Sequence, residues 1–134
     1  MASDTAQVGI VVVSHSTDLA SGLAELAAEM AGPSVPIEAA GGRADGGLGT
    51  DEDRVMAAIA RAGRGGGGVV VLGDLGSSIL TVRHLLERRA NGHVRLADAP
   101  FVEGAVSAAV TASAGAGLEE VLRAAEEARD AHKV

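Results

Sequence analysis

The sequence predicts an α/β fold: an open, doubly wound, mainly parallel sheet with helices on both faces. Short apolar segments rich in β-branched residues alternate with segments whose apolar residues recur at three- and four-residue spacing, as strands and helices alternate in such folds. The strands expected at residues 8–13 and 69–72 are apolar throughout, which is typical of parallel strands covered on both faces. At 134 residues the chain is expected to form one domain, residues 1–134.

The first half of the chain is predicted to supply two strands and two helices. Thr17 or Asp18 can cap a helix that follows the first strand and ends at Gly32. A second strand is predicted at residues 35–39. After the glycine-rich loop 41–49, the Thr-Asp-Glu-Asp of residues 50–53 resembles a capping box with aspartate in place of Glu or Gln, and it predicts a helix to about residue 62.

The next segment begins with four glycines, residues 65–68. They are predicted to form a flexible loop and not a P-loop, because they precede a strand and no Gly-Lys-Ser/Thr follows them. After the strand at 69–72, the turn 73–78 offers a serine as N-cap for a helix at about 79–89, closed by Asn91 and Gly92. A short fourth strand is predicted at 94–97.

Beyond Pro100 the sequence favours two closing helices, at about residues 102–114 and 118–131. The first of these segments also contains β-branched residues, so part of 101–111 could instead form an extra C-terminal edge strand.

Composition excludes several classes of function. The formal net charge of −7 argues against nucleic acid as a partner, since nucleic-acid binding normally requires a basic patch. Phe101 is the one aromatic residue, which leaves no platform for stacking a base or a flavin. There is no cysteine, no signal peptide is recognised before the apolar run ends at Val13, and no segment is long enough to span a membrane. A cytoplasmic protein is expected.

Topology predicts that two distant polar residues meet. In a doubly wound sheet of order 2-1-3-4, the switch point falls between the first and third strands, whose carboxyl ends carry His15 and Asp74. A carboxylate beside an imidazole fixes its tautomer and orientation, which leaves the other ring nitrogen free as a nucleophile.

Phosphoryl transfer is the chemistry that this pair fits best. No nucleophile elbow is present for acyl transfer, and His84, His93 and His132 have no metal-ligand spacing with His15, so no metal is expected. The helix that follows Ser77 can point its N–H groups at the same crevice, which favours a phosphate there. No Walker motif is present, so we expect no bound cofactor and a phosphate carried covalently on His15.

Four segments, 8–16, 41–50, 73–78 and 99–106, together resemble the DhaM family, the phosphotransferase subunits of the phosphoenolpyruvate-dependent dihydroxyacetone kinases. The first domain of that family is similar to the mannose-type IIA (EIIA) domains of the sugar phosphotransferase system. The resemblance covers nearly the whole chain. Residues 81–84 (Thr-Val-Arg-His) depart from the family pattern.

The resemblance implies a phosphorelay. His15 matches the phosphorylated histidine, which takes its phosphoryl group from the phosphocarrier protein HPr and passes it to ADP held by the DhaL subunit. The resulting ATP phosphorylates dihydroxyacetone on DhaK. Asp74 matches the carboxylate beside that histidine. Family members are homodimers, in the mannose-type relatives through an exchanged C-terminal strand.

Four hydroxyl residues are candidate phosphate ligands, and each also has a purely structural interpretation. Thr50 and Ser77 could be plain helix caps, and Ser14 and Ser16 small polar residues of the turn. Two alternative functions remain open: a mannose-type EIIA component of a sugar permease, and a non-catalytic, flavodoxin-like nucleotide-binding module. The scarcity of aromatic residues weighs against the second.

Overall fold

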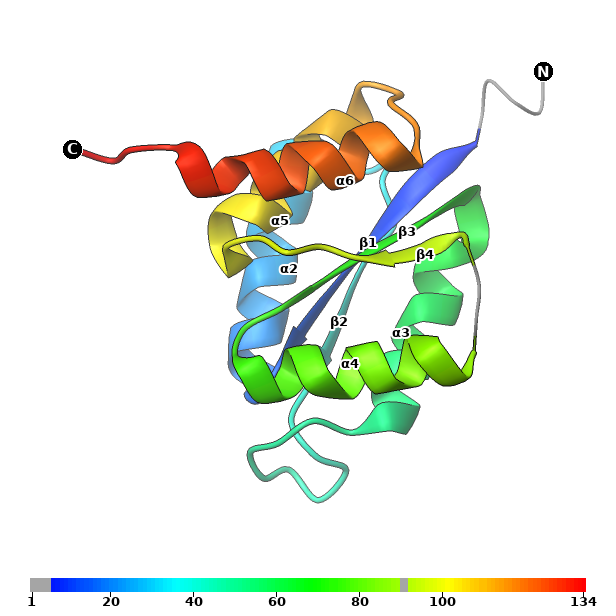
Figure 1. Ribbon diagram of the computed structural model, residues 1–134, viewed down its shortest axis with the longest axis vertical. Helices are drawn as coiled ribbons and strands as arrows, with labels where there is room; N and C mark the ends of the chain where they lie inside the picture. The colour runs from blue at the N-terminus through cyan, green and yellow to red at the C-terminus, as the bar shows by residue number, and fades with distance from the viewer. Residues whose placement is uncertain (1–5, 90–91) are drawn as a thin grey trace.

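Four parallel strands form a single sheet at the centre of the protein. The computed structural model describes residues 6–89 and 92–134. The strands are β1 (Gln7–Ser14), β2 (Ile37–Gly41), β3 (Gly66–Gly73) and β4 (Val94–Leu96), in the order β2-β1-β3-β4 (Figure 1). The predicted fold class and strand order are confirmed.

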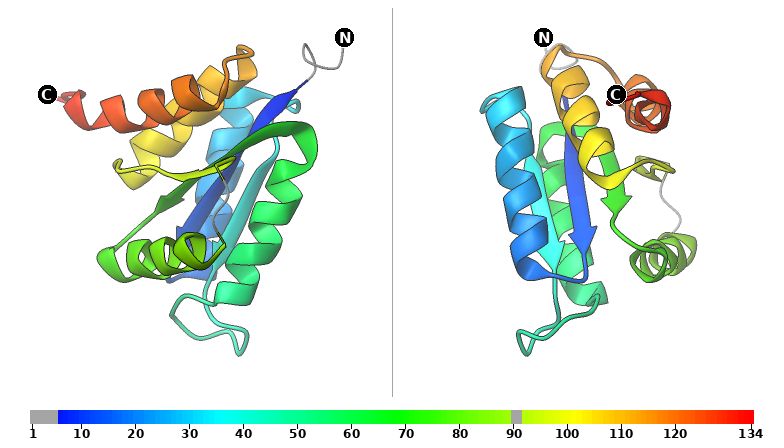
Figure 2. Two further views of the ribbon diagram at one scale, coloured as in Figure 1. Left: turned by 45° about the vertical axis from the view of Figure 1, so that its right-hand side comes forward. Right: turned by 90° about the vertical axis from the view of Figure 1, so that its left-hand side faces the viewer.

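Helices cover both faces of this sheet (Figure 2). Helices α2 (Thr17–Ala31), α5 (Phe101–Ser113) and α6 (Leu118–Glu127) pack on one face, and α3 (Glu52–Ala62) and α4 (Gly76–Arg88) on the other. Within β1, Ile10 and Val12 enter the first core, while Val11 and Val13 enter the second. Every residue of the strand from Val8 to Ser14 is buried, which explains its unbroken apolar sequence.

The caps differ from those expected, because a residue one position away supplies the acceptor. The hydroxyl of Ser16, and not that of Thr17 or Asp18, accepts the Leu19 N–H at the start of α2. Asp51, and not Thr50, caps α3 by accepting the N–H groups of Asp53 and Arg54.

Helix α4 begins at Gly76, three residues before the predicted start, and no side chain caps it. The serines of the turn are therefore inside its first turn instead of before it. Its predicted stop includes Asn91, which lies outside the described residues.

The four glycines are not a loop. Gly65 closes a short 3-10 turn, η1 (Gly63–Gly65), and the next three belong to β3. The neighbouring strand explains them, because a Cβ on Gly67 would lie 2.7 Å from the carbonyl oxygen of Gln7. Close backbone approach, and not flexibility, requires glycine here.

Residues 101–113 and 118–127 are helical, so the two expected closing helices are confirmed, and the alternative of a C-terminal edge strand is not found in the part of the chain that the structure describes. The reason is the spacing of small residues on α5: Ala105, Ala108, Ala109 and Ala112 are fully buried and bring the helix close to β1 and α6. Alanine has the highest helix propensity, which outweighs the scattered β-branched residues. After α6 the chain ends in η2 (Ala128–Asp130) and a short tail, and no helix in the described residues is long and apolar enough to cross a membrane.

The packing of α3 on β1 gives a test of this arrangement. A Cβ on Gly9 would overlap the backbone carbonyl of Ala62, which cannot move aside as a side chain could. Gly9→Ala is expected to lower the free energy of unfolding in urea by about 1–3 kcal/mol. Gly22→Ala is the matched control, because Gly22 is exposed within α2 with open space around its Cα; it should raise that free energy by about 0.5–1 kcal/mol. Equal stability of Gly9→Ala and the parent would contradict the described packing.

Candidate functional site

The carboxyl ends of β1 and β3 bring His15 and Asp74 together, as the strand order predicts. Strand pairing continues one step past the strands, since the Asp74 N–H donates to the Val13 carbonyl over 3.0 Å. The two side chains then meet, with 3.0 Å between Nδ1 of His15 and Oδ1 of Asp74.

Five hydrogen-bond donors surround the Asp74 carboxylate. Its Oδ2 accepts the Ser14 hydroxyl at 2.8 Å and the His15 backbone N–H at 3.1 Å. Its Oδ1 accepts the Ser78 hydroxyl at 2.8 Å and the Leu75 N–H at 2.7 Å, besides the His15 ring. Such a shell fixes the carboxylate in one orientation.

These contacts decide the charge of Asp74. Burial acts to raise the pKa of its carboxyl, but the hydroxyls of Ser78 and Ser14 and the donors of His15 outweigh burial and lower that pKa to about 2. Asp74 is therefore a carboxylate throughout the neutral range, and it has no proton to donate.

The charge of Asp74 in turn assigns the tautomer of His15. Because Asp74 can only accept, Nδ1 of His15 carries the proton, and Nε2 keeps its lone pair. The hydroxyl of Ser77 bonds to Nε2. The His15 side chain is 24% exposed, whereas that of Asp74 is 8% exposed, so the nucleophilic nitrogen is on the open side of the pair.

The structure separates the four predicted phosphate ligands. Ser77 alone contacts the reactive nitrogen. Thr50 reaches the site indirectly, with 3.2 Å between its hydroxyl and that of Ser78. Ser14 is fully buried and its hydroxyl is engaged by Asp74 and by the Ser16 N–H, so it positions the carboxylate and does not face an incoming phosphate. Ser16 caps α2.

Sequence reasoning missed Ser78. It is fully buried and touches three partners: its hydroxyl lies 2.8 Å from Asp74 Oδ1, 3.1 Å from His15 Nδ1 and 3.2 Å from Thr50. The spacing could have predicted this contact, since Ser78 follows Asp74 by four residues and faces it across the first turn of α4. The expectation of an N-cap serine concealed that role.

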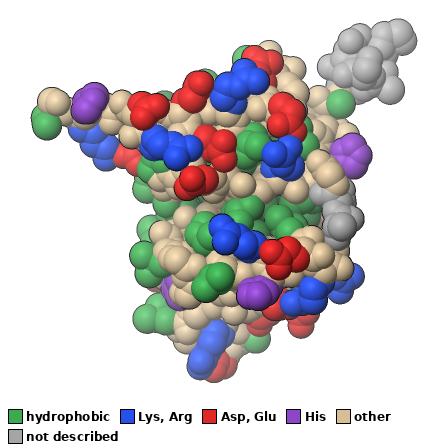
Figure 3. Space-filling view, viewed as in Figure 1, with side chains coloured by type: hydrophobic (Ala, Val, Ile, Leu, Met, Phe, Trp, Pro, Cys, Tyr) green, Lys and Arg blue, Asp and Glu red, His purple; other side chains and the backbone are tan. Residues whose placement is uncertain are grey.

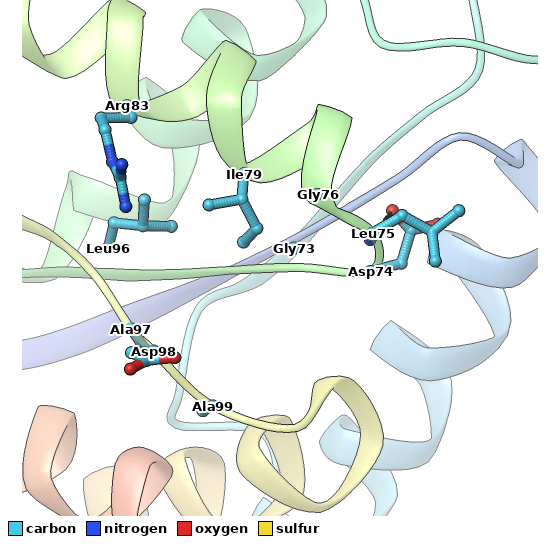
Figure 4. A pocket seen from close by; sticks show the side chains of 10 residues that line it. All are labelled: Gly73, Asp74, Leu75, Gly76, Ile79, Arg83, Leu96, Ala97, Asp98 and Ala99. Carbon is cyan, nitrogen blue, oxygen red and sulfur yellow. Dashed lines mark hydrogen bonds between the residues drawn. The ribbon is translucent and has the colours of Figure 1, made fainter.

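A cleft of about 350 Å³ shares the β3–α4 turn with the histidine site (Figure 4). Asp74, Leu75 and Gly76 form one end of it. The rest is formed by Gly73 of β3, by Ile79 and Arg83 of α4, and by Leu96 of β4 with residues 97–99 after it.

Two charged side chains outside this network are engaged in ion pairs. Arg43 is ion-paired to Asp45 on the exposed loop, 2.7 Å apart, and Glu103 is paired with Lys133. Among the described residues no group of three or more His, Asp or Glu side chains could hold a metal ion.

The site combines a nucleophilic ring nitrogen, a buried negative charge on the opposite ring nitrogen, and the first turn of a helix beside the open side. Such a helix start offers unpaired N–H groups to an anion. The arrangement can bind a phosphoryl group covalently and support the positive charge that the ring then gains.

Comparisons with known proteins agree with this chemistry. The family of PTS system fructose IIA components, EIIA-man, matches residues 9–122. The phosphoryl donor subunit DhaM of a PEP-dependent dihydroxyacetone kinase from Klebsiella michiganensis is 38% identical over 95% of this chain, which covers 28% of that protein. DhaM of kinase 2 from Listeria innocua is 36% identical over 87% of this chain, and here 94% of the relative is covered.

Solved structures share the fold. A protein of unknown function with a known crystal structure is 32% identical, with a TM-score of 0.78 over 90% of this chain and 94% of that chain. A sigma-54 interaction domain protein from Enterococcus faecalis is 19% identical, with a TM-score of 0.72 over 94% of this chain and 93% of that one, a likeness of fold alone.

The chain spans little more than a quarter of the length of the first of these relatives and almost all of the second. The family match extends from β1 into α6 and includes both His15 and Asp74. The chain belongs to the EIIA-man family of PTS components, and within it to the DhaM subunits.

Proposed function

We propose that the chain is the phosphoryl carrier of a phosphoenolpyruvate-dependent dihydroxyacetone kinase. His15 accepts a phosphoryl group from phosphorylated HPr and passes it to ADP bound to the DhaL subunit, which serves DhaK. The proposal depends on the polarity of the His15 ring. Nδ1 donates to Asp74, which is ionised at neutral pH, and Nε2 keeps its lone pair. The names of the relatives support the choice of kinase, and the proposal places the chain in the cytoplasm with these partners.

In the first step Nε2 attacks the phosphorus of the donor. The bond between phosphorus and the donor's nitrogen breaks, that electron pair returns to the donor, and a P–N bond forms at Nε2. Nδ1 keeps its proton, so the His15 ring becomes cationic, and Asp74 stabilises that charge from 3.0 Å. In the second step an oxygen of ADP attacks the phosphorus and forms a P–O bond. The P–N bond at Nε2 breaks, its electron pair returns to Nε2, and the ring becomes neutral again.

Ser77 changes partner during this cycle. Its hydroxyl donates to Nε2 in the resting site, so it must release that nitrogen before phosphorylation. Once Nε2 carries the phosphoryl group, the same hydroxyl and the N–H groups of the first turn of α4 are placed to donate to phosphoryl oxygens. The hydroxyls of Thr50 and Ser78 remain hydrogen-bonded to each other beside the site and do not contact the phosphoryl group.

His15 is predicted to be the only phosphate acceptor. Incubation with phosphoenolpyruvate, enzyme I and HPr should add about 80 Da in an acid-labile, base-stable form. His15→Ala should abolish this mass increase, whereas His84→Ala, which changes an exposed histidine of α4, should not. Labelling that persists without His15 would contradict the proposal.

Asp74→Asn should slow phosphorylation without unfolding the protein. The amide can donate to Nδ1 and so favours the wrong tautomer, and it cannot stabilise the cationic ring. We expect a rate loss of about 10- to 1000-fold, less than the largest losses known for an orienting carboxylate. Since Asp74 has a pKa of about 2, it is ionised in the parent at every pH from about 5 to 9, so the defect should be present throughout that range. A defect that disappears within this range would contradict the assigned charge.

We also propose that the protein acts as a homodimer through α5. Val102, Val106 and Val110 recur at four-residue spacing, and the first and last are each 42% exposed although the opposite side of the helix is buried. A stripe of this kind suits a twofold partner.

Sedimentation tests the dimer. The parent should sediment as twice 13.2 kDa, and Val110→Asp should shift it toward the monomer because the interface would then bury an unpaired charge. Ser113→Asp, at an exposed position near the end of the same helix, is the control and should leave the dimer intact. A parent that remains monomeric at roughly 100 µM would refute the dimer.

A further inference from the structure

The cleft beside α4 contains a cation that the described part of the protein leaves unpaired. Arg83 extends from α4 toward Leu96 on the opposite wall (Figure 4). Within residues 6–89 and 92–134, its guanidinium makes no hydrogen bond and no ion pair. A guanidinium carries five N–H donors. The cleft therefore holds a positive group whose hydrogen-bonding capacity is open to a ligand.

The acidic side chains of the cleft are engaged elsewhere. Arg83 is the only cation among the lining residues, and the two acids are Asp74 and Asp98. Asp74 is hydrogen-bonded by five donors, none of them Arg83. Asp98 lies 3.4 Å from the guanidinium of Arg129. Because no acid on the walls pairs with Arg83, an anion from solution can take that place.

The cleft is formed before any ligand enters, because contacts within the fold hold its walls. On one side, the Ala97 N–H donates to a carbonyl of β3 over 2.9 Å, and the Asp98 N–H donates to the Glu126 carboxylate over 3.0 Å. On the other side, Ile79 packs directly on Gly73, where a Cβ would lie 2.7 Å from the Ile79 Cδ1. Preformed cavities are typical of small-molecule sites, since binding then costs little conformational entropy.

The size and chemistry of the walls define the class of ligand. The volume of about 350 Å³ is near the lower end for small-molecule sites. Arg83 can bind one carboxylate or phosphate group through two parallel hydrogen bonds. Ile79 and Leu96 offer C–H surface to the body of a ligand, and apolar side chains are visible in the hollow at the centre of Figure 3, next to a basic one. Phe101, the one aromatic residue, is not on the walls, so a nucleotide base would find no stacking partner.

We propose that this cleft binds a small organic anion, of the size of a sugar acid or a sugar phosphate, with its carboxylate or phosphate group on Arg83. The site differs from the phosphoryl-transfer site. Arg83 follows Gly76 by seven residues, about 10 Å along α4, and it is not among the groups that contact the His15 ring. The proposal goes beyond the phosphoryl carrier function and does not depend on it.

An NMR titration of the isotopically labelled protein tests the site. The probes are glucose 6-phosphate and gluconate, which join a sugar-sized body to a phosphate or a carboxylate, and glucose, which has no charge. At least one anion should shift the backbone amide signals of Ile79 and Leu96 in a saturable way at about 0.15 M salt. Glucose should not. The anion that binds more tightly identifies which charged group the site prefers.

Three variants assign the binding to Arg83. Arg83→Gln removes the charge and the paired donors, and it should weaken binding at least about tenfold. Arg83→Lys keeps the charge without the planar fork and should give an intermediate affinity. Arg123→Gln is the matched control, because Arg123 is an exposed residue of α6 that does not line the cleft and its loss changes the net charge equally. This control should bind the anion as the parent does.

The transfer site is the rival location for an anion, since the first turn of α4 lies beside Nε2 of His15. Ser77→Ala removes a donor of that site and should leave the affinity unchanged. Weaker binding by Ser77→Ala but not by Arg83→Gln would place the anion at the transfer site and overturn the proposal.

The remaining outcomes are also decisive. Equal weakening by Arg83→Gln and Arg123→Gln would indicate attraction by net charge alone, and the cleft would not be a site. The absence of a saturable shift with either anion, or an equal response to glucose, would refute it as well. Failure of His15 to accept phosphate would instead refute the proposed function and leave these affinities unaffected.

Discussion

The buried carboxylate of Asp74 is the group on which the rest of the site depends. Its five donors come from the end of β1, from its own turn and from the first turn of α4, so one side chain joins three segments. Removing the carboxylate would leave the buried hydroxyls of Ser14 and Ser78 without this acceptor, at about 1–3 kcal/mol for each one unsatisfied. The requirement is mutual, because the same donors keep Asp74 ionised in spite of its burial.

The sheet makes this arrangement rigid. His15 and Asp74 follow adjacent central strands whose flanks are packed on both faces, and the pairing of Val13 with Gly73 fixes their relative height. Catalytic geometry that must be held to a fraction of an ångström is best placed at the ends of such strands. The loop between β2 and α3, in contrast, joins the site through only a few contacts, among them the Gly49 N–H on His15 and the Thr50 hydroxyl on Ser78.

The sequence predicted the strand order and the pairing of His15 with Asp74, which depend on periodicity and topology. It did not predict which of several adjacent residues caps a helix. Apolar runs and helical spacing gave the strand order, and that order gave the meeting of His15 and Asp74. The caps of α2 and α3 went to Ser16 and Asp51, because cap geometry is decided by backbone conformation and several adjacent residues were equally suitable. The burial of Ser78 and the exposure of Leu48 and Leu75 depend on tertiary packing around a turn and a loop. Such segments have no repeating hydrophobic pattern from which burial could be predicted.

A carrier must hold its phosphoryl group without stabilising it too far, and the charges around His15 suit that task. Under the proposed function, neutral donors such as the Ser77 hydroxyl and the helix N–H groups would contact the phosphoryl oxygens, while Asp74 acts only on the ring. A lysine or arginine fixed beside the phosphate would lower the energy of the phosphorylated state in every complex and at every moment, and so reduce the driving force for onward transfer. If the partners bring the cations, that stabilisation is present only while a partner is docked and the phosphoryl group is in transit. The acidity of the chain then favours binding of a basic partner without making the phosphohistidine a thermodynamic trap.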